Sequence, residues 1–119
     1  MWLMTRHGFY SVVEKPRGQI QVRSRERQDL ENLVERVPLP EATIVDTPHA
    51  DYAARIIGDR ATLLRILEFL GDTVDYDNFK NRIDATKDQA HKPYHKVWQV
   101  MADALGAYGS GGKSRRKDI

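Results

Sequence analysis

Alternating apolar and polar positions near the start of the chain predict a β-hairpin. Residues 9–15 are rich in β-branched and aromatic side chains, and the alternation places Phe9 and Tyr10 on opposite faces of a strand. The Pro-Arg-Gly sequence at residues 16–18 is typical of a turn, because proline fixes φ and glycine tolerates positive φ. Residues 19–23 alternate again and are expected to form the returning strand.

The first strand is expected to extend further back along the chain. Residues 2–4 are apolar and precede the strand by only a few positions. Gly8 lies between the two segments, and a bulge or bend costs little at a glycine. We therefore expect Trp2 to Met4 to continue the same strand.

A helix is predicted after this hairpin, over residues 25–37. Its apolar positions follow the spacing of one helix face and are Leu30, Leu33, Val34 and Val37. Ser24 is the expected N-cap, and Pro38 ends the helix. Acidic residues early in the helix, Asp29 among them, interact favourably with its dipole.

A second hairpin and a second helix are expected between residues 42 and 70. The strands are residues 42–46 and 52–57, joined by a turn that contains proline and aspartate. Asp59 is the expected cap of a helix over residues 60–70. The apolar face of this helix is formed by Leu63, Ile66, Leu67 and Leu70.

The last third of the chain is expected to be helical. A short helix is predicted after Asp75, with apolar positions at Tyr76, Phe79 and Ile83. Thr86 and Gln89 match a capping box at the start of a longer helix that ends at Gly106. The apolar positions of the longer helix are Tyr94, Val97, Trp98, Met101 and Leu105. Trp98 is expected to fill the core.

Together these elements give the order β-β-α-β-β-α, followed by one or two additional C-terminal helices. Such an order predicts an α+β fold with a small antiparallel sheet, as a ferredoxin-like or similar two-layer sandwich. Residues 1–108 are expected to form a single α+β domain. Residues 109–119 are rich in glycine, serine and basic residues, and are expected to form a disordered basic tail.

Composition agrees with one domain and excludes several kinds of chemistry. The chain has 119 residues, of which 40% are hydrophobic and 30% charged, as is usual for a folded domain. It contains no cysteine, which excludes a disulfide scaffold, a thiol nucleophile and a cysteine zinc site. The first residues lack the apolar stretch of a signal peptide, and no stretch approaches the ~20 residues that span a bilayer. We therefore expect a cytoplasmic protein with no membrane partner.

The basic character of the chain is concentrated at its end. The sequence pI is about 9.0 and the formal net charge is +2. Lys113, Arg115, Arg116 and Lys117 stand there against Asp118 alone, so the rest of the chain is close to neutral. A flexible basic tail adds salt-dependent affinity for nucleic acid, so these four residues are candidates for nucleic-acid binding. The alternative is a tail that only aids solubility.

Three segments of the chain resemble one group of short proteins. They are residues 2–13 (W-L-M-T-R-H-G-F-Y-S-V-V), 76–80 (Y-D-N-F-K) and 94–98 (Y-H-K-V-W). The group comes from actinobacteria and their phages, and the resemblance covers residues 1 to about 106. It implies a cytoplasmic accessory protein, phage-encoded in some cases, and implies no activity, cofactor or site residue.

Two clusters have the residue types of a metal site. His91 and His95 lie four apart, which places both imidazoles on one face of a helix. Asp72, Asp75 and Asp77 supply the oxygen ligands that hard cations favour. We interpret the histidines as solvated and the acids as helix caps, because no H-E-x-x-H pattern is present and caps have the same sequence signature. We expect no catalytic residue, no metal and no cofactor.

Two groups of residues are candidates for recognition. Tyr76, Asn78 and Lys80 supply an aromatic ring, an amide and a cation, which can stack on a base and hold a phosphate. Arg23 and Arg25 begin a basic run that continues at Arg27. We interpret that run as a solvated, salt-bridged face and not as a phosphate clamp, since acidic residues are interleaved with it.

Three functions are compatible with this sequence. The first is a small non-enzymatic binding or regulatory protein that acts on a protein partner, through an edge of its sheet. The second is a nucleic-acid-binding module that uses the basic tail and an aromatic strand face containing Phe9 and Tyr10. The third is an enzyme with an unfamiliar aspartate or histidine site. We favour the first, and leave a homodimer open.

Overall fold

The computed structural model describes residues 1–39, 44–79 and 88–106 of the chain. It divides into two compact units, Met1–Phe79 and Lys80–Ile119, which are described in turn. The predicted tail and the expected capping box at Thr86 lie outside the described residues.

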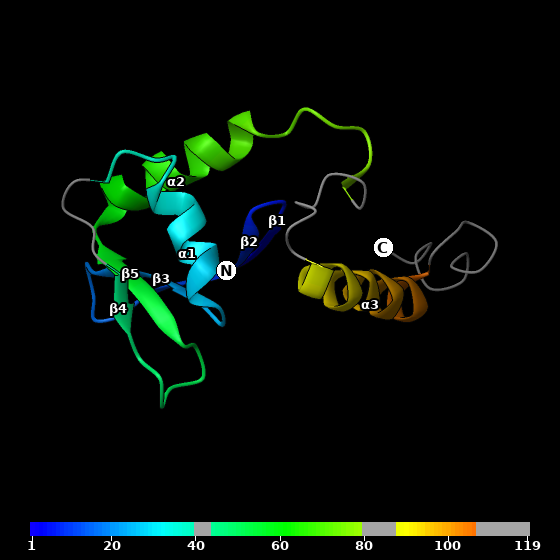
Figure 1. Ribbon diagram of the computed structural model, residues 1–119, viewed down its shortest axis with the longest axis horizontal. Helices are drawn as coiled ribbons and strands as arrows, with labels where there is room; N and C mark the ends of the chain where they lie inside the picture. The colour runs from blue at the N-terminus through cyan, green and yellow to red at the C-terminus, as the bar shows by residue number, and fades with distance from the viewer. Residues whose placement is uncertain (40–43, 80–87, 107–119) are drawn as a thin grey trace. The chain divides into compact units, whose positions relative to one another are not determined.

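The first unit contains a five-stranded antiparallel sheet (Figure 1). Its strands are β1 (Trp2–Thr5), β2 (Gly8–Glu14), β3 (Ile20–Ser24), β4 (Ile44–Asp46) and β5 (Ala54–Gly58). They lie in the order β1-β2-β3-β5-β4, so the second hairpin inserts β5 beside β3 and leaves β4 at an edge. Every neighbouring pair is antiparallel, which confirms the predicted α+β class with its small antiparallel sheet.

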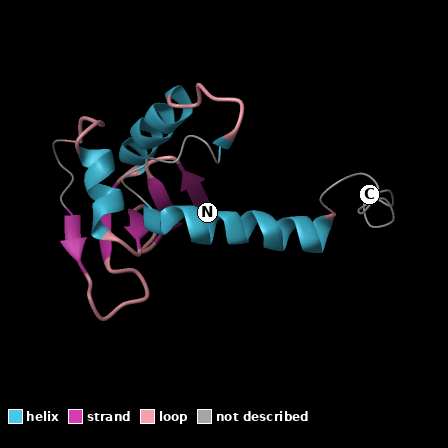
Figure 2. Ribbon diagram, turned by 45° about the vertical axis from the view of Figure 1, so that its right-hand side comes forward, coloured by secondary structure: helices cyan, strands magenta, loops and turns pink. Residues whose placement is uncertain are grey.

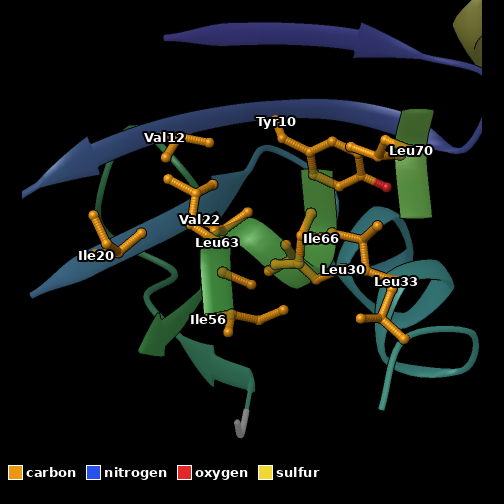
Figure 3. Close-up of a cluster of buried hydrophobic side chains, with 12 residues drawn as sticks. Tyr10, Val12, Ile20, Val22, Leu30, Leu33, Ile56, Leu63, Ile66 and Leu70 are labelled. Atoms are coloured by element: carbon orange, nitrogen blue, oxygen red, sulfur yellow. The ribbon is translucent and has the colours of Figure 1, made fainter. Parts of the chain in front are cut away.

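Two helices, α1 (Arg27–Val34) and α2 (Arg60–Asp72), pack on one face of this sheet (Figure 2). The alternation along each strand sends one set of side chains toward these helices. Figure 3 shows the resulting core, whose buried members are Tyr10, Val12, Ile20, Val22, Leu30, Leu33, Val37, Ala54, Ile56, Leu63, Ile66 and Leu70. Burial of this apolar surface is the main source of stability for the unit.

The expected backward extension of the first strand is wrong. The chain turns at Arg6 and His7, and β1 runs back beside β2 with Leu3 opposite Tyr10. Gly8 therefore lies at the tight turn between two antiparallel strands, and not at a bend within one strand. The N-terminal amine donates to the Val12 carbonyl at 2.8 Å, which extends the pairing to the first residue.

Helix α1 is shorter than predicted, and its expected cap is wrong. It spans Arg27–Val34, and Glu26 occupies the N-cap position without a side-chain hydrogen bond to the helix. Ser24 instead ends β3, and its hydroxyl donates to the Glu26 carbonyl at 2.6 Å. Pairing of β3 with β5 holds Ser24 in the sheet and so delays the helix start.

Helix α2 begins where the sequence predicts. Asp59 accepts a hydrogen bond from the Thr62 amide at 2.9 Å, and the Thr62 hydroxyl lies 3.4 Å from the Asp59 amide. This reciprocal pair is a capping box. The hydrogen bonds from Thr62 lower the pKa of Asp59.

The short helix expected after Asp75 does not begin there. Residues 74–78 are not helical, and the part of the expected helix that contains Ile83 lies outside the described residues. Tyr76 and Phe79 are half-buried and lie with their ring centroids 6.1 Å apart. Asp75 lies 3.4 Å from the Arg6 guanidinium, so it forms an ion pair instead of a helix cap.

The second unit contains one described helix, α3 (Asp88–Leu105), with Pro93 inside it. Gly106 follows at a positive φ of 92°, a conformation that ends helices readily at glycine. The expected burial of Trp98 is wrong, since 39% of this residue is exposed. Among the described residues, no helix has the length and apolar character to cross a membrane.

Candidate anion-binding site

The sheet face opposite α1 and α2 has an unusual set of side chains. Strand register and alternation assign to this open face Trp2, Met4, Phe9, Ser11, Val13, Gln21, Arg23, Val45, Arg55 and Ile57. None of these positions is acidic, although acidic residues are frequent elsewhere in the unit. The open face therefore combines apolar and aromatic side chains with positive charge alone.

Two arginines stand side by side at the centre of this face. Arg23 on β3 is directly opposite Arg55 on β5, and Ser11 on β2 is opposite Arg23 on its other side. Neighbouring strands are about 4.8 Å apart, so the two cationic side chains start from adjacent backbone positions. Like charges in such a pair destabilise a sheet.

Neutral oxygen atoms hold both guanidinium groups in place. Arg23 Nη2 donates to Ser11 Oγ at 2.8 Å, and Ser11 is only 1% exposed. Arg55 Nη1 donates to Gln21 Oε1 at 2.8 Å, while Arg55 Nε donates to Thr47 Oγ1 at 3.3 Å. These bonds orient the guanidinium groups without neutralising their charge.

A third arginine joins this pair through Tyr52, which precedes β5. The guanidinium carbons of Arg23 and Arg25 lie 4.5 and 4.8 Å from the centroid of the Tyr52 ring. Tyr52 is 7% exposed, and cation–π attraction is strengthened where water is excluded. Arg25 Nη1 also donates to the Asp51 carbonyl at 3.1 Å. We call Arg23, Arg25 and Arg55 the arginine cluster.

No carboxylate contacts the arginine cluster among the residues that the structure describes. Arg27 shows the contrast, because it pairs with Asp46 at 2.6 Å and with Glu31 at 3.2 Å. The hydrogen bond to Asp46 is the main cause that raises the pKa of Arg27. The expected salt-bridged face therefore exists at Arg27 but is wrong for Arg23 and Arg25.

Two aromatic rings flank the cluster on the β1 side. Trp2 is 73% exposed, an unusual state for so large an apolar side chain, and it is opposite Ser11 in the register. Its ring meets that of Phe9 edge-on, with centroids 6.0 Å apart. The row from Trp2 through Ser11 and Arg23 to Arg55 thus crosses four strands of the open face.

Polar groups of α1 fix the turn that positions Phe9. The Asp29 carboxylate accepts from the Phe9 amide at 3.1 Å, and Asn32 Nδ2 donates to the His7 carbonyl at 2.8 Å. The hydroxyl of Tyr10 donates to the Asp29 carbonyl at 2.7 Å. Asp29 thus tethers the start of β2 to α1, a role that its expected interaction with the helix dipole did not predict.

The chemistry of the open face favours binding of an anion. A guanidinium presents several N–H donors in a planar fork that matches phosphate and carboxylate oxygens. Three such groups, oriented by neutral acceptors and without a carboxylate among the described residues, leave their charge available to a ligand. The exposed ring of Trp2, which meets the half-buried ring of Phe9 edge-on, can stack on a planar group of the same ligand.

The recognition residues predicted from sequence lie elsewhere or outside the described part. Asn78 is exposed and Tyr76 is half-buried beside Phe79, whereas Lys80 is not described. The tail residues Lys113, Arg115, Arg116 and Lys117 also lie outside the described residues. None of these residues belongs to the arginine cluster.

The two candidate metal clusters can be compared with the structure only in part. Among the described residues, no three histidine or acidic side chains are grouped so that they could hold a metal ion. His95 stacks on Trp98 with ring centroids 5.8 Å apart. The side chain of His91 is outside the described part of the chain.

The sequence prediction missed Arg55 and the role of Tyr52. A signal was present, because Arg55 alternates with the buried Ala54 and Ile56 and must point to the opposite face of β5. Comparison with protein-family models, with curated proteins and with solved structures finds no match for this chain.

Proposed function

We propose that this chain is a non-enzymatic binding protein whose open sheet face binds single-stranded nucleic acid. The observation that carries the proposal is the arginine cluster, which meets no carboxylate among the described residues and lies beside Tyr52. A phosphate backbone supplies the negative charge that the cluster lacks, and arginine binds phosphate in a bidentate manner.

The aromatic side chains of the face support a single strand over a duplex. Unpaired bases stack on exposed rings, and this stacking tolerates any sequence. Trp2, two strands away from Arg23, supplies such a ring, and the half-buried ring of Phe9 lies beside it. A paired duplex keeps its bases inside and would offer these rings nothing to stack on.

The proposal changes the expected nucleic-acid surface in one respect. Phe9 lies on the open face, but Tyr10 is fully buried among the core residues and cannot contact a ligand there. The basic tail adds non-specific attraction through its charge, and the arginine cluster supplies the oriented site.

The direct test is the affinity of the full chain for short single-stranded RNA and DNA, measured by fluorescence anisotropy at several salt concentrations. The double variant Arg23→Gln/Arg55→Gln should bind about 10–100-fold more weakly, which corresponds to about 0.7–1.4 kcal/mol for each of the two arginines. It should also reduce the slope of log K against log salt by about 1.4, since each single-strand phosphate contact contributes about 0.7.

A matched control separates the site from net charge. Arg36 and Arg60 are exposed and pair with Glu35 and Glu14, so Arg36→Gln/Arg60→Gln removes the same charge from other surfaces. The proposal expects this control to bind nearly as tightly as the wild-type chain. Equal weakening in both double variants, or no binding by the wild-type chain at low salt, would refute it.

Helix α3 favours a second function, binding of a protein partner. Its exposed apolar side chains recur at helical spacing and include Val97, Met101 and Leu105, with exposures of 46, 53 and 43%. An apolar helix stripe of this kind is a common means of protein recognition. Affinity capture with the wild-type chain should return a stoichiometric protein partner. The Val97→Asp/Met101→Asp variant should lose this partner, and the control variant Gln99→Ala should keep it. Capture of the same partner by all three chains would count against binding through α3.

A further inference from the structure

The arginine cluster concentrates more charge than one phosphodiester can neutralise. Arg23 and Arg55 extend from directly opposed backbone positions, and Arg23 and Arg25 both lie against one Tyr52 ring. A phosphodiester carries a single negative charge, and successive diesters lie one nucleotide apart along the strand. A phosphomonoester carries about −1.5 to −2 at pH 7 and presents three acceptor oxygens at one point.

Each member of the cluster keeps donors for such a group. Arg55 uses Nε and Nη1 on Thr47 and Gln21, and Arg25 uses only Nη1 on the Asp51 carbonyl. Their remaining Nη2 groups meet no acceptor among the described residues. Arg23 uses Nη2 on Ser11, and its Nη1 group meets no acceptor within the same part of the chain.

The opposed arginines raise the free energy of the ligand-free protein, because like charges at directly opposite positions of a sheet repel each other. The hydrogen bond to Ser11 and the contact with the Tyr52 ring hold the Arg23 guanidinium in place. An acceptor-rich dianion beside the cluster would offset the repulsion between Arg23 and Arg55. A neutral ligand would not offset it.

From these observations we infer that the arginine cluster is a phosphomonoester site, which takes the terminal phosphate of a nucleic-acid strand. The inference rests on the proposed function and adds to it the part of the strand that is recognised. Arg23 and Arg55 hold the phosphate oxygens, Arg25 supplies the third charge, and Tyr52 keeps Arg23 and Arg25 together. The strand then leads away toward Phe9 and Trp2, where its first bases stack.

The test compares one oligonucleotide sequence with different ends. Three forms, with a 5′-phosphate, with a 3′-phosphate and with hydroxyl groups at both ends, are titrated into the full chain under identical salt. At least one phosphorylated form should bind about tenfold more tightly than the hydroxyl form, as charge-assisted hydrogen bonds to a dianion require. Inorganic phosphate and a mononucleotide, added as competitors, should reduce this advantage and show whether the nucleoside contributes.

Substitutions then test whether the arginine cluster causes the preference for phosphorylated ends. Arg55→Gln should bind all three forms with similar affinity, whereas Arg36→Gln should retain the tenfold preference. Equal affinity of the wild-type chain for the phosphorylated and hydroxyl forms overturns the phosphomonoester site and leaves the proposed function standing. Absence of binding to every form overturns both. If Arg55→Gln still prefers the phosphorylated forms, the site is also overturned, because another surface must then bind the terminal phosphate.

Discussion

Arg23 lies directly opposite Arg55 across strands β3 and β5, and Ser11 and Gln21 hold the two guanidinium groups with neutral oxygens. Opposed like charges cost a sheet a fraction of a kcal/mol to about 1 kcal/mol. A fold selected only for stability would place an acid or an apolar residue at one of these positions. The proposed binding surface accounts for this pair, because its ligand would supply the missing charge.

Removal of one member of this pair should weaken binding with little effect on the fold. Arg55→Gln relieves the repulsion with Arg23 but loses the hydrogen bonds to Gln21 and Thr47, so the free energy of unfolding should change by less than about 1 kcal/mol in the absence of ligand. The same variant should bind single strands about tenfold less well. Urea denaturation and anisotropy on one preparation measure both effects, and a variant that loses stability and affinity together would indicate a structural role instead.

Exposure of Trp2 predicts a direct optical signal of binding. The chain has two tryptophans, so the Trp98→Phe variant isolates the fluorescence of Trp2, which is 73% exposed. Stacking of a base on this ring should quench the emission. Trp2→Ala should weaken binding by about 1–3 kcal/mol, the value of one base–aromatic stack. Unchanged emission on saturation with ligand would place the strand away from β1.

Gly8 is expected to be the most sensitive glycine of the first unit. It has φ +155°, and a Cβ atom there would lie 2.7 Å from Asp29 Oδ1, closer than contact distances allow. Gly8→Ala must therefore displace the carboxylate that accepts from the Phe9 amide. We expect a loss of about 2–3 kcal/mol in the free energy of unfolding, measured by urea denaturation.

Gly71 provides the control for this substitution. It lies in α2, and a Cβ built there meets no atom within 4 Å apart from its chain neighbours and the backbone of its own helix. Gly71→Ala should leave stability unchanged or raise it by up to about 1 kcal/mol, because alanine favours helix more than glycine. Equal destabilisation by both substitutions would show that steric contact with Asp29 is not the cause.

The cap of α2 predicts a specific dependence on pH. The pKa of Asp59 is lowered from its ordinary value of 3.8, chiefly by the hydrogen bond from the Thr62 amide. A lowered folded-state pKa means that the carboxylate stabilises the fold above its ordinary pKa, and that this contribution is lost as the pH falls through the folded value. Asparagine caps helices as well as aspartate but does not titrate.

The Asp59→Asn variant should therefore match the wild-type chain near neutral pH. On acidification below about pH 4, its melting temperature should fall less steeply than that of the wild-type chain. Thermal unfolding followed by circular dichroism across this range compares the two. If the melting temperatures of both chains fall equally steeply below about pH 4, Asp59 is excluded as a source of the acid sensitivity.

Local patterns predicted most of the fold because they depend on residues close in sequence. Alternation correctly placed Phe9 and Tyr10 on opposite faces of the strand, and Asp59 caps α2 where the sequence predicted. Failures arose where distant pairing decides the outcome. Ser24 has the chemistry of an N-cap, but pairing with Ala54 keeps it in β3.

Local sequence patterns could not predict the candidate site either, because the site also depends on pairing between distant parts of the chain. Acidic neighbours in the sequence favoured ion pairs for the whole run from Arg23 to Arg27, and only Arg27 forms them, with partners that include the distant Asp46. Arg23 instead faces Arg55, which is far along the chain and reaches it only because β5 inserts beside β3. The cluster is a product of strand order, which hydrophobic periodicity does not determine.

The central claim, that the open face is the binding surface, is tested most directly by NMR titration of the isotope-labelled full chain with a short single strand. The account predicts that the largest shifts occur at the backbone amides of Ser11, Arg23 and Arg55 and at the Nε–H groups of these two arginines. It also predicts small shifts on α1 and α2, which cover the other face. Shifts confined to residues 113–117, with the open-face signals unmoved at saturation, would contradict the account and assign binding to the basic tail.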